Sequence, residues 1–296
     1  MASAELQMVL DLLRAQPIPR DRGWAEQRAG LERMMSMMPP PADVSCTPVT
    51  IAGRAAEWVA APEARQDQTL LYLHGGGYCI GSINTHRHLA ADLSRAAGLR
   101  VLVLDYRLGP EHPFPAAVED ASAAYRALLA DGADPRSLAI VGDSAGGGLT
   151  AATLLALRDA DTPLPAAAVL LSPWLDLTQS GESMTSKAGV DPMVQREALQ
   201  TMADAYLAGA DARVPLASPL FADLRRLPPL LVHVGTAETL LDDATRFADR
   251  ARAAGVDVTL ETFADMVHVF HAFAFVLPEA RDANAKVGAF LRERLA

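Results

Sequence analysis

The sequence lacks several features that mark particular classes of protein. Its 296 residues contain only two cysteines, Cys46 and Cys79, too few for a disulfide-stapled scaffold. No uninterrupted apolar run approaches the roughly twenty residues that a bilayer-spanning helix needs. A His-Glu-x-x-His motif is absent, and we expect neither a metal site nor a cofactor. The first residues lack the basic-then-apolar pattern of a signal peptide, which predicts a cytoplasmic protein.

Positive charge is also scarce. Lysine and arginine number 26 against 36 acidic residues, which gives a formal net charge of −10. The average field of such a chain repels nucleic acids and anionic membranes, so we expect neither as a partner. Half of the residues are hydrophobic, which is enough for one large α/β core with a smaller appendage.

Apolar runs alternate with helical segments along most of the chain. This pattern is typical of a mainly parallel sheet with helices on both faces. The expected parallel strands lie at residues 69–73, 100–104, 138–141, 168–171, 230–234 and 256–263, after an antiparallel pair at 49–51 and 56–59. The expected helices lie at residues 88–97, 116–130, 145–159 and 242–254.

Two segments interrupt this alternation and supply no strand. Residues 1–43 contain two amphipathic helical stretches, and residues 179–215 are rich in Asp, Gly and Met. Both fall where a lid would cover the carboxyl edge of the sheet. We therefore expect a helical cap built from these two pieces, and a core formed by residues 44–178 and 216–296.

Residues 142–146, Gly-Asp-Ser-Ala-Gly, follow an apolar run and precede a long helical stretch. This arrangement is typical of a nucleophile elbow, where a strand turns sharply into a helix and strains the backbone of its turn residue. Glycines two positions either side of Ser144 let the strand and the helix approach each other. The pattern predicts that Ser144 Oγ is an acyl-accepting nucleophile. A glycine-rich turn holding a bystander serine is the alternative.

A second glycine-rich motif, His-Gly-Gly-Gly at residues 74–77, follows the expected strand at residues 69–73. Backbone amides exposed by such a loop stabilise the negative oxygen that forms in acyl transfer, each by roughly 100- to 1000-fold in rate. We expect the amides of Gly75, Gly76 and Ala145 to form this oxyanion hole, the last of them at a helix N-terminus. A flexible turn is the alternative.

Five ordered motifs together resemble the bacterial hormone-sensitive-lipase-like esterases. Besides the two glycine motifs, they are Asp-Tyr-Arg-Leu-Gly-Pro-Glu-His-Pro-Phe-Pro-Ala-Ala at residues 105–117, Leu-Ser-Pro-Trp-Leu-Asp-Leu-Thr at 171–178 and Met-Val-His at 266–268. The resemblance extends over nearly the whole chain. It implies an α/β-hydrolase fold with a helical cap, and a cofactor-free enzyme that hydrolyses carboxylic esters of short-to-medium acyl length.

The resemblance also implies the base that activates Ser144. His268 follows the last expected strand, and its order after the serine matches the serine, acid, histidine order of the α/β hydrolases. The other histidines lie in the glycine loop, at a helix start, in a proline-rich turn or inside a strand. His271, one helical turn beyond His268, is the alternative.

For the orienting acid, three carboxylates follow the expected strand at residues 230–234. Glu238 occupies the loop position where the family carries its acid, most often Asp, so this chain departs by one methylene. Asp242 and Asp243 are more typical of a helix start, where amides and the helix dipole favour carboxylates. The predicted triad is Ser144, His268 and Glu238, with Asp242 as the alternative acid.

Substrate contacts are predicted beside the motifs and in the first cap segment. The residues proposed are Asp143, Tyr78, Cys79, Met34 and Met38. Methionines adapt to irregular apolar shapes, which suits a pocket, although ordinary core is the alternative. For Cys79 the alternative is a small buried hydrophobe.

Proteins with other functions carry the same catalytic residues or the same fold. An amidase, lactonase or deacetylase can operate with this triad and oxyanion hole. A second class is a catalytically silent small-molecule-binding module, as in the plant gibberellin receptors, which resemble this family but lost the triad histidine. This chain retains His268. The resemblance is also compatible with a homodimer formed through an edge strand such as the one expected at residues 256–263, of which the sequence itself gives no direct sign.

Overall fold

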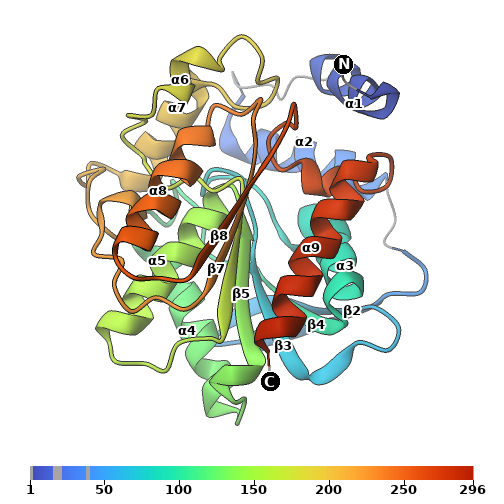
Figure 1. Ribbon diagram of the computed structural model, residues 1–296, viewed down its shortest axis with the longest axis vertical. Helices are drawn as coiled ribbons and strands as arrows, with labels where there is room; N and C mark the ends of the chain where they lie inside the picture. The colour runs from blue at the N-terminus through green and yellow to red at the C-terminus, as the bar shows by residue number, and fades with distance from the viewer. Residues whose placement is uncertain (1–2, 16–21, 38–40, 296) are drawn as a thin grey trace.

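One eight-stranded sheet forms the centre of the computed structural model, which describes residues 3–15, 22–37 and 41–295 (Figure 1). The strands lie in the order β1-β2-β4-β3-β5-β6-β7-β8. Their bounds are β1 Ser45–Ile51, β2 Arg54–Ala60, β3 Arg65–Leu73, β4 Leu99–Leu104, β5 Leu138–Asp143, β6 Ala167–Leu171, β7 Leu230–Gly235 and β8 Val258–Phe263.

The sheet combines an antiparallel edge with a parallel body. Strand β1 pairs antiparallel with β2, and β2 with β4, whereas all pairs from β4 through β3 to β8 are parallel. The predicted opening antiparallel pair and the mainly parallel α/β sheet are therefore confirmed. Every residue of β5, β6 and β7 is buried, as expected of parallel strands covered on both faces.

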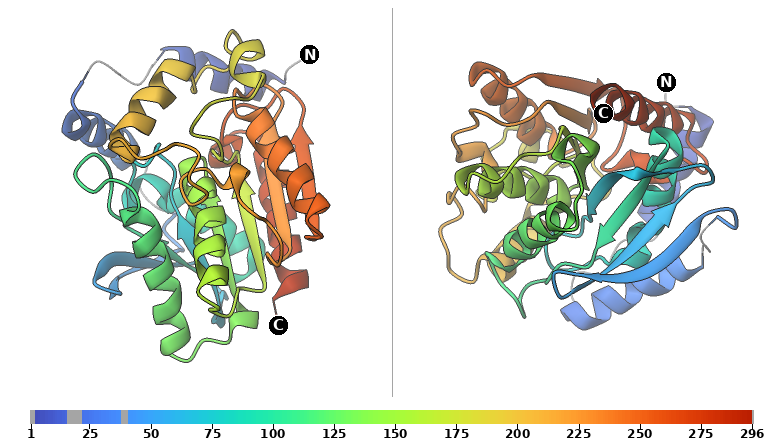
Figure 2. Two further views of the ribbon diagram at one scale, coloured as in Figure 1. Left: turned by 90° about the vertical axis from the view of Figure 1, so that its left-hand side faces the viewer. Right: turned by 90° about the horizontal axis from the view of Figure 1, so that it is seen from below.

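Helices cover both faces of the sheet (Figure 1, Figure 2). One face carries α3 Ile83–Ala97 and α9 Pro278–Arg294, and the other carries α4 Ala116–Ala130, α5 Ala145–Asp159 and α8 Leu241–Ala253. Side chains of successive strand residues point to opposite faces of the sheet. Ile140 belongs to the core under α4 and α5, and Val141 to the core under α3.

Two of the predicted helices, at residues 116–130 and 145–159, have the observed bounds of α4 and α5. Helix α3 begins earlier than predicted, at Ile83 and not at residue 88. The Ser82 hydroxyl accepts a hydrogen bond from the Thr85 amide, and the Thr85 hydroxyl from the Ser82 amide. This capping box satisfies amides of the first turn and starts the helix there.

Four more helices lie over the carboxyl edge of the sheet: α1 Ala4–Ala15, α2 Trp24–Ser36, α6 Ser183–Ser186 and α7 Arg196–Leu207 (Figure 1, Figure 2). Residues 179–215 contain α6 and α7 and no strand, as predicted. Leu6 and Val9 of α1 are buried in one cluster with Met266 and Val267, directly before His268. In the described part of the chain, every helix is too short or too polar to cross a membrane.

Candidate active site

Ser144 stands at the sharp turn between β5 and α5. Its φ of 53° lies in the left-handed region that non-glycine residues rarely adopt, so the predicted strained turn is present. The two flanking glycines are required by close approach: a Cβ on Gly142 would overlap the Gly146 carbonyl, and a Cβ on Gly146 would overlap the Leu73 carbonyl. The Ser144 amide donates to Leu171 O at 2.8 Å, which fixes the turn against β6.

His268 and Glu238 are hydrogen-bonded to each other. The Nδ1 atom of His268 lies 2.8 Å from Oε2 of Glu238, and the two residues are 5% and 0% exposed. Burial alone would lower the pKa of His268, but the hydrogen bond to Glu238 and the charges of Glu238, Asp191 and Asp143 raise it above 6.5. A carboxylate so placed holds the imidazole with Nδ1 protonated and Nε2 available as a base.

The topology brings these residues to one edge of the sheet. Ser144 follows β5, Glu238 follows β7 and His268 follows β8, and β5, β6, β7 and β8 are parallel neighbours. Ligands of open α/β sheets bind at this carboxyl edge. The three residues of the predicted triad therefore lie where such a fold carries its chemistry.

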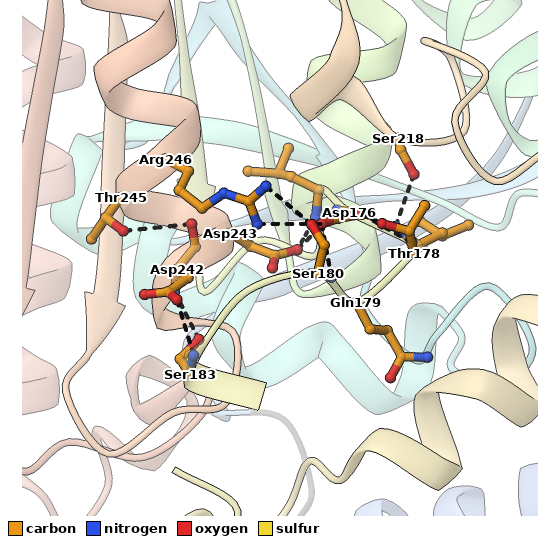
Figure 3. Close-up of polar contacts among 12 residues, drawn as sticks. Asp176, Thr178, Gln179, Ser180, Ser183, Ser218, Asp242, Asp243, Thr245 and Arg246 are labelled. Carbon is orange, nitrogen blue, oxygen red and sulfur yellow. Dashed lines mark hydrogen bonds and ion pairs between the residues drawn. The ribbon is translucent and has the colours of Figure 1, made fainter. Parts of the chain in front are cut away.

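The alternative acids have other partners (Figure 3). Asp242 Oδ2 accepts the amide of Ser183 at 2.9 Å, and Asp243 Oδ2 accepts the amides of Leu175 and Asp176 at 2.8 and 2.9 Å. Both carboxylates of α8 thus bind the segment that leads from β6 into residues 179–215. Glu238 is the carboxylate of this loop that contacts the histidine.

The alternative base, His271, is a core residue. It is fully buried, and its Nε2 lies 3.1 Å from Nδ1 of His233, which is also fully buried. Burial lowers the pKa of both rings, that of His233 to about 3, and both stay neutral at physiological pH.

In the glycine loop after β3, one amide of the predicted oxyanion hole, that of Gly75, is already hydrogen-bonded within the protein. The Gly75 amide donates to Asp143 Oδ1 at 3.0 Å, and an amide has only one hydrogen to give. Within the described residues, the amides of Gly76 and Gly77 donate no hydrogen bond. The Ala145 amide belongs to the first residue of α5, where no intrahelical acceptor exists.

Asp143 was predicted to contact substrate, and its surroundings contradict this. The carboxylate is 3% exposed; Oδ1 also accepts the Tyr72 hydroxyl at 2.5 Å, and Oδ2 lies 3.5 Å from Nε2 of His86. Burial alone would raise its pKa, but His86 and the Tyr72 hydrogen bond hold the pKa below the usual value. Its position under the glycine loop makes Asp143 an anchor for Gly75.

Aromatic rings also pack against this loop. The His74 ring stacks on Tyr106 at 4.3 Å between centroids, and the Tyr106 hydroxyl donates to the His74 carbonyl at 2.7 Å. Burial and the neighbouring His86 lower the pKa of His74 to about 3, so this ring is a neutral support.

The remaining predicted substrate residues lie at the boundary with α7 or on the surface. Tyr78 is buried and stacks on Tyr206 at 3.9 Å, and Cys79 Sγ lies 3.7 Å from the Met202 carbonyl. Burial raises the pKa of the Cys79 thiol to about 12, as expected of a small buried hydrophobe. Met34 is 39% exposed, and Met38 lies outside the described residues. Substrate contact by these residues stays a prediction.

Ser172 is the residue near the site that the sequence reasoning missed. It follows β6, its hydroxyl donates to Glu238 Oε1 at 2.7 Å, and its side chain is fully buried. Its position in the sequence could have indicated this. Ser172 follows β6, which lies between β5, the strand before Ser144, and β7, the strand before Glu238. Among the residues that the structure describes, no group of three or more His, Cys, Asp or Glu side chains could hold a metal ion.

Comparison with known proteins gives consistent matches. Residues 70–272 match a family profile described as alpha/beta hydrolase fold. An acetyl-hydrolase of Streptomyces hygroscopicus is 49% identical over 99% of this chain and 97% of its own length. A crystal structure of an esterase from the bacterial hormone-sensitive lipase family is 52% identical, with a TM-score of 0.96 and full coverage of both chains. The esterase EstE5, in a crystal soaked with p-nitrophenyl butyrate, is 48% identical, with a TM-score of 0.95 and 99% of each chain covered.

Proposed function

This chain is a carboxylic ester hydrolase that belongs to the bacterial hormone-sensitive-lipase-like esterases of the α/β-hydrolase fold, and we propose that its catalytic triad is Ser144, His268 and Glu238. One observation carries the proposal. The buried carboxylate of Glu238 lies 2.8 Å from Nδ1 of a buried histidine, at the sheet edge where Ser144 stands in its strained turn.

In the proposed reaction, Nε2 of His268 removes the proton of Ser144 Oγ as this oxygen attacks the ester carbonyl carbon. The C–O bond to the alcohol then breaks, and His268 returns the proton to the leaving alcohol. Water, deprotonated by the same nitrogen, attacks the acyl-enzyme and releases the acid. Glu238 holds the ring tautomer and stabilises the imidazolium that forms in each half of the reaction.

We propose Gly76, Gly77 and Ala145 as the oxyanion donors. The Gly75 amide is excluded by its bond to Asp143, and the next two amides of the loop have no acceptor among the described residues. Both positions favour glycine. A Cβ on Gly76 would overlap the Ile80 carbonyl, and Gly77 has a left-handed φ of 60°, which strains residues with a side chain.

We propose short-to-medium acyl esters as substrates, with acetyl and butyryl esters as the first to test. Two relatives support this range: one is named an acetyl-hydrolase, and another was soaked with p-nitrophenyl butyrate. We further propose that residues 1–43 and 179–215 form the cap over this site. A homodimer remains a prediction; β8 is an edge strand, and sedimentation measures the oligomeric state.

The proposal is tested by initial rates on p-nitrophenyl esters of increasing acyl length. The wild-type protein is compared with Ser144→Ala, His268→Ala and Glu238→Ala, each purified identically. We expect turnover by the wild type, background rates for the first two variants and a large loss for the third. Full activity of Ser144→Ala or His268→Ala contradicts the assignment, and matched amide and lactone substrates separate an esterase from an amidase or lactonase.

A further inference from the structure

Ser172 occupies a constrained position between the strands of the site. It directly follows β6, and its amide donates to the His233 carbonyl of the neighbouring β7 at 2.7 Å. Its φ of 47° lies in the left-handed region, and its side chain is fully buried. A non-glycine residue held in this conformation is fixed by its surroundings, and so the direction of its side chain is fixed as well.

The hydroxyl of Ser172 joins the two loops that carry the acid and the histidine. Its hydrogen is donated to Glu238 Oε1 at 2.7 Å, and its oxygen accepts the Val269 amide at 3.1 Å. Val269 is the residue after His268 and itself has a left-handed φ of 48°. One hydroxyl therefore contacts both members of the Glu238–His268 pair, the acid directly and the histidine through its neighbour in the chain.

These contacts divide the two oxygens of Glu238 between two tasks. Oε1 accepts both the Ser172 hydroxyl and, at 2.5 Å, the Gly235 amide, while Oε2 faces Nδ1 of His268. A glutamate has one more rotatable bond than an aspartate, so its carboxylate needs an added restraint to keep one orientation. The Ser172 hydroxyl is the side-chain group that supplies this restraint.

We propose that Ser172 is a positioning residue for the ester-hydrolysis reaction: it fixes the Glu238 carboxylate and the His268 loop relative to each other, and thereby keeps Nε2 aimed at Ser144. The inference rests on the proposed triad. Ser172 acts through Glu238 and Val269 and exchanges no proton with the substrate. Small misplacements of a catalytic base cost up to roughly 100-fold in rate.

The test compares Ser172→Ala with a matched control, Ser94→Ala. Ser94 is likewise fully buried, donates to the Leu99 carbonyl at 2.8 Å and accepts the Ala61 amide at 2.9 Å, but it lies in α3 away from the triad. Each substitution removes one buried hydroxyl that makes two hydrogen bonds, so similar losses of melting temperature are expected. Ser172→Ala is expected to lower kcat by roughly 10- to 100-fold with KM within about twofold, and Ser94→Ala to leave kcat within about twofold.

A spectroscopic readout separates positioning from general destabilisation. The Nδ1 proton of His268, identified by its absence in His268→Ala, is expected to shift and broaden in the NMR spectrum of Ser172→Ala and to stay unchanged in Ser94→Ala. Ser172→Cys keeps the shape of the side chain but carries a somewhat larger atom that is a weaker donor, and its kcat should fall between those of the wild type and Ser172→Ala. It also serves as the test if the alanine variant does not fold.

The outcomes distinguish this inference from the proposed function. If Ser144→Ala and His268→Ala are inactive while Ser172→Ala and Ser172→Cys match Ser94→Ala in kcat and in the Nδ1 proton signal, the positioning role is overturned and the esterase mechanism stands. If Glu238→Ala retains full activity, the triad itself fails and the role of Ser172 fails with it.

Discussion

The Gly75 amide donates a 3.0 Å hydrogen bond to Oδ1 of Asp143, the last residue of β5 and the direct neighbour of Ser144. This bond ties the glycine loop after β3 to the turn that carries the nucleophile. In the proposed mechanism, the distance between Ser144 and the oxyanion donors therefore depends on this buried carboxylate. The amides of Gly76 and Gly77, which donate no hydrogen bond among the described residues, are the donors proposed from this loop.

Replacing Asp143 is therefore expected to disturb the site without touching the substrate. Asp143→Ala leaves the Gly75 amide and the buried Tyr72 hydroxyl without an acceptor, at roughly 1–3 kcal/mol for each unsatisfied group. We expect kcat to fall at least about tenfold and the urea midpoint to drop. Asp143→Asn keeps one acceptor oxygen and is the matched control, with smaller losses expected in both. Wild-type kcat in Asp143→Ala would show that the glycine loop holds its position without this bond.

The pH dependence of kcat/KM should report His268. The base must be neutral, and the pKa of His268 is raised above 6.5, chiefly by Glu238 acting against the effect of burial. The value of kcat/KM is therefore expected to rise with pH through that pKa, reaching half of its maximum above pH 6.5. Initial rates from pH 5 to 9, corrected for spontaneous ester hydrolysis, measure this limb. A flat profile from pH 5 to 8 is incompatible with a histidine base.

Glu238→Gln supplies the matched test of that pKa. The amide keeps the size of the side chain and removes its negative charge, so the pKa of His268 should fall and the acidic limb should move to lower pH. The maximal rate should drop by at least about 100-fold, because the imidazolium loses its counter-charge and its fixed tautomer. An unchanged limb would mean that Glu238 does not interact with the titrating group.

The stability of the fold should also depend on pH through Asp243. Burial raises the pKa of this carboxyl from 3.8 to about 8, with nearby Asp176 adding to the shift and the amides of Leu175 and Asp176 opposing it. The folded state thus binds a proton more tightly than the unfolded chain. The contribution to stability is full below about pH 4 and is lost as pH rises toward 8, at a slope approaching ~1.4 kcal/mol per pH unit.

Asp243→Asn removes this titration while keeping an oxygen for the two amides. The unfolding free energy of the wild type relative to Asp243→Asn is therefore expected to be lower at pH 8 than at pH 5, measured by urea unfolding at both values. A difference that stays constant between the two values, or increases with pH, would contradict the buried neutral carboxyl.

Arg107 is expected to stabilise the fold and not to bind substrate. Its guanidinium lies 2.9 Å from the nearly buried carboxylate of Asp120 and 3.0 Å from Glu119. Asp120 keeps the Arg107 amide and Arg54 when the side chain is truncated, so Arg107→Ala should cost only about 1–3 kcal/mol. Urea unfolding measures the loss, and KM should stay unchanged. An unchanged urea midpoint in Arg107→Ala would contradict a stabilising role for this side chain.

The strands, the elbow and the helices α4 and α5 could be predicted because their signals are local. Apolar runs bounded by turn residues define the strands, and glycines at fixed offsets mark the turn at Ser144. The loop position of Glu238 favours it over Asp242 and Asp243 as the acid, and the contacts agree, since the two aspartates bind the Ser183 amide and the amides after β6.

The remaining features depend on contacts between segments far apart in the sequence. Whether Gly75 points its amide at an oxyanion or at Asp143 is decided by the packing of β3 beside β5. The role of Ser172 arises from residues 66 and 97 positions away. Glu111, in the motif at residues 105–117, is exposed and forms an ion pair at 2.7 Å with Arg28 of α2. No sequence pattern specifies such partners.

Covalent labelling tests whether Ser144 is a nucleophile activated by His268. Phenylmethylsulfonyl fluoride transfers its sulfonyl group to an activated serine with loss of fluoride, and mass spectrometry of the digested protein locates the adduct. We expect one adduct, on the peptide that contains Ser144, and we expect it to form in step with the loss of esterase activity. It should be absent in Ser144→Ala and form far more slowly in His268→Ala. Complete loss of activity with Ser144 unmodified, or equal labelling rates in His268→Ala and the wild type, would contradict it.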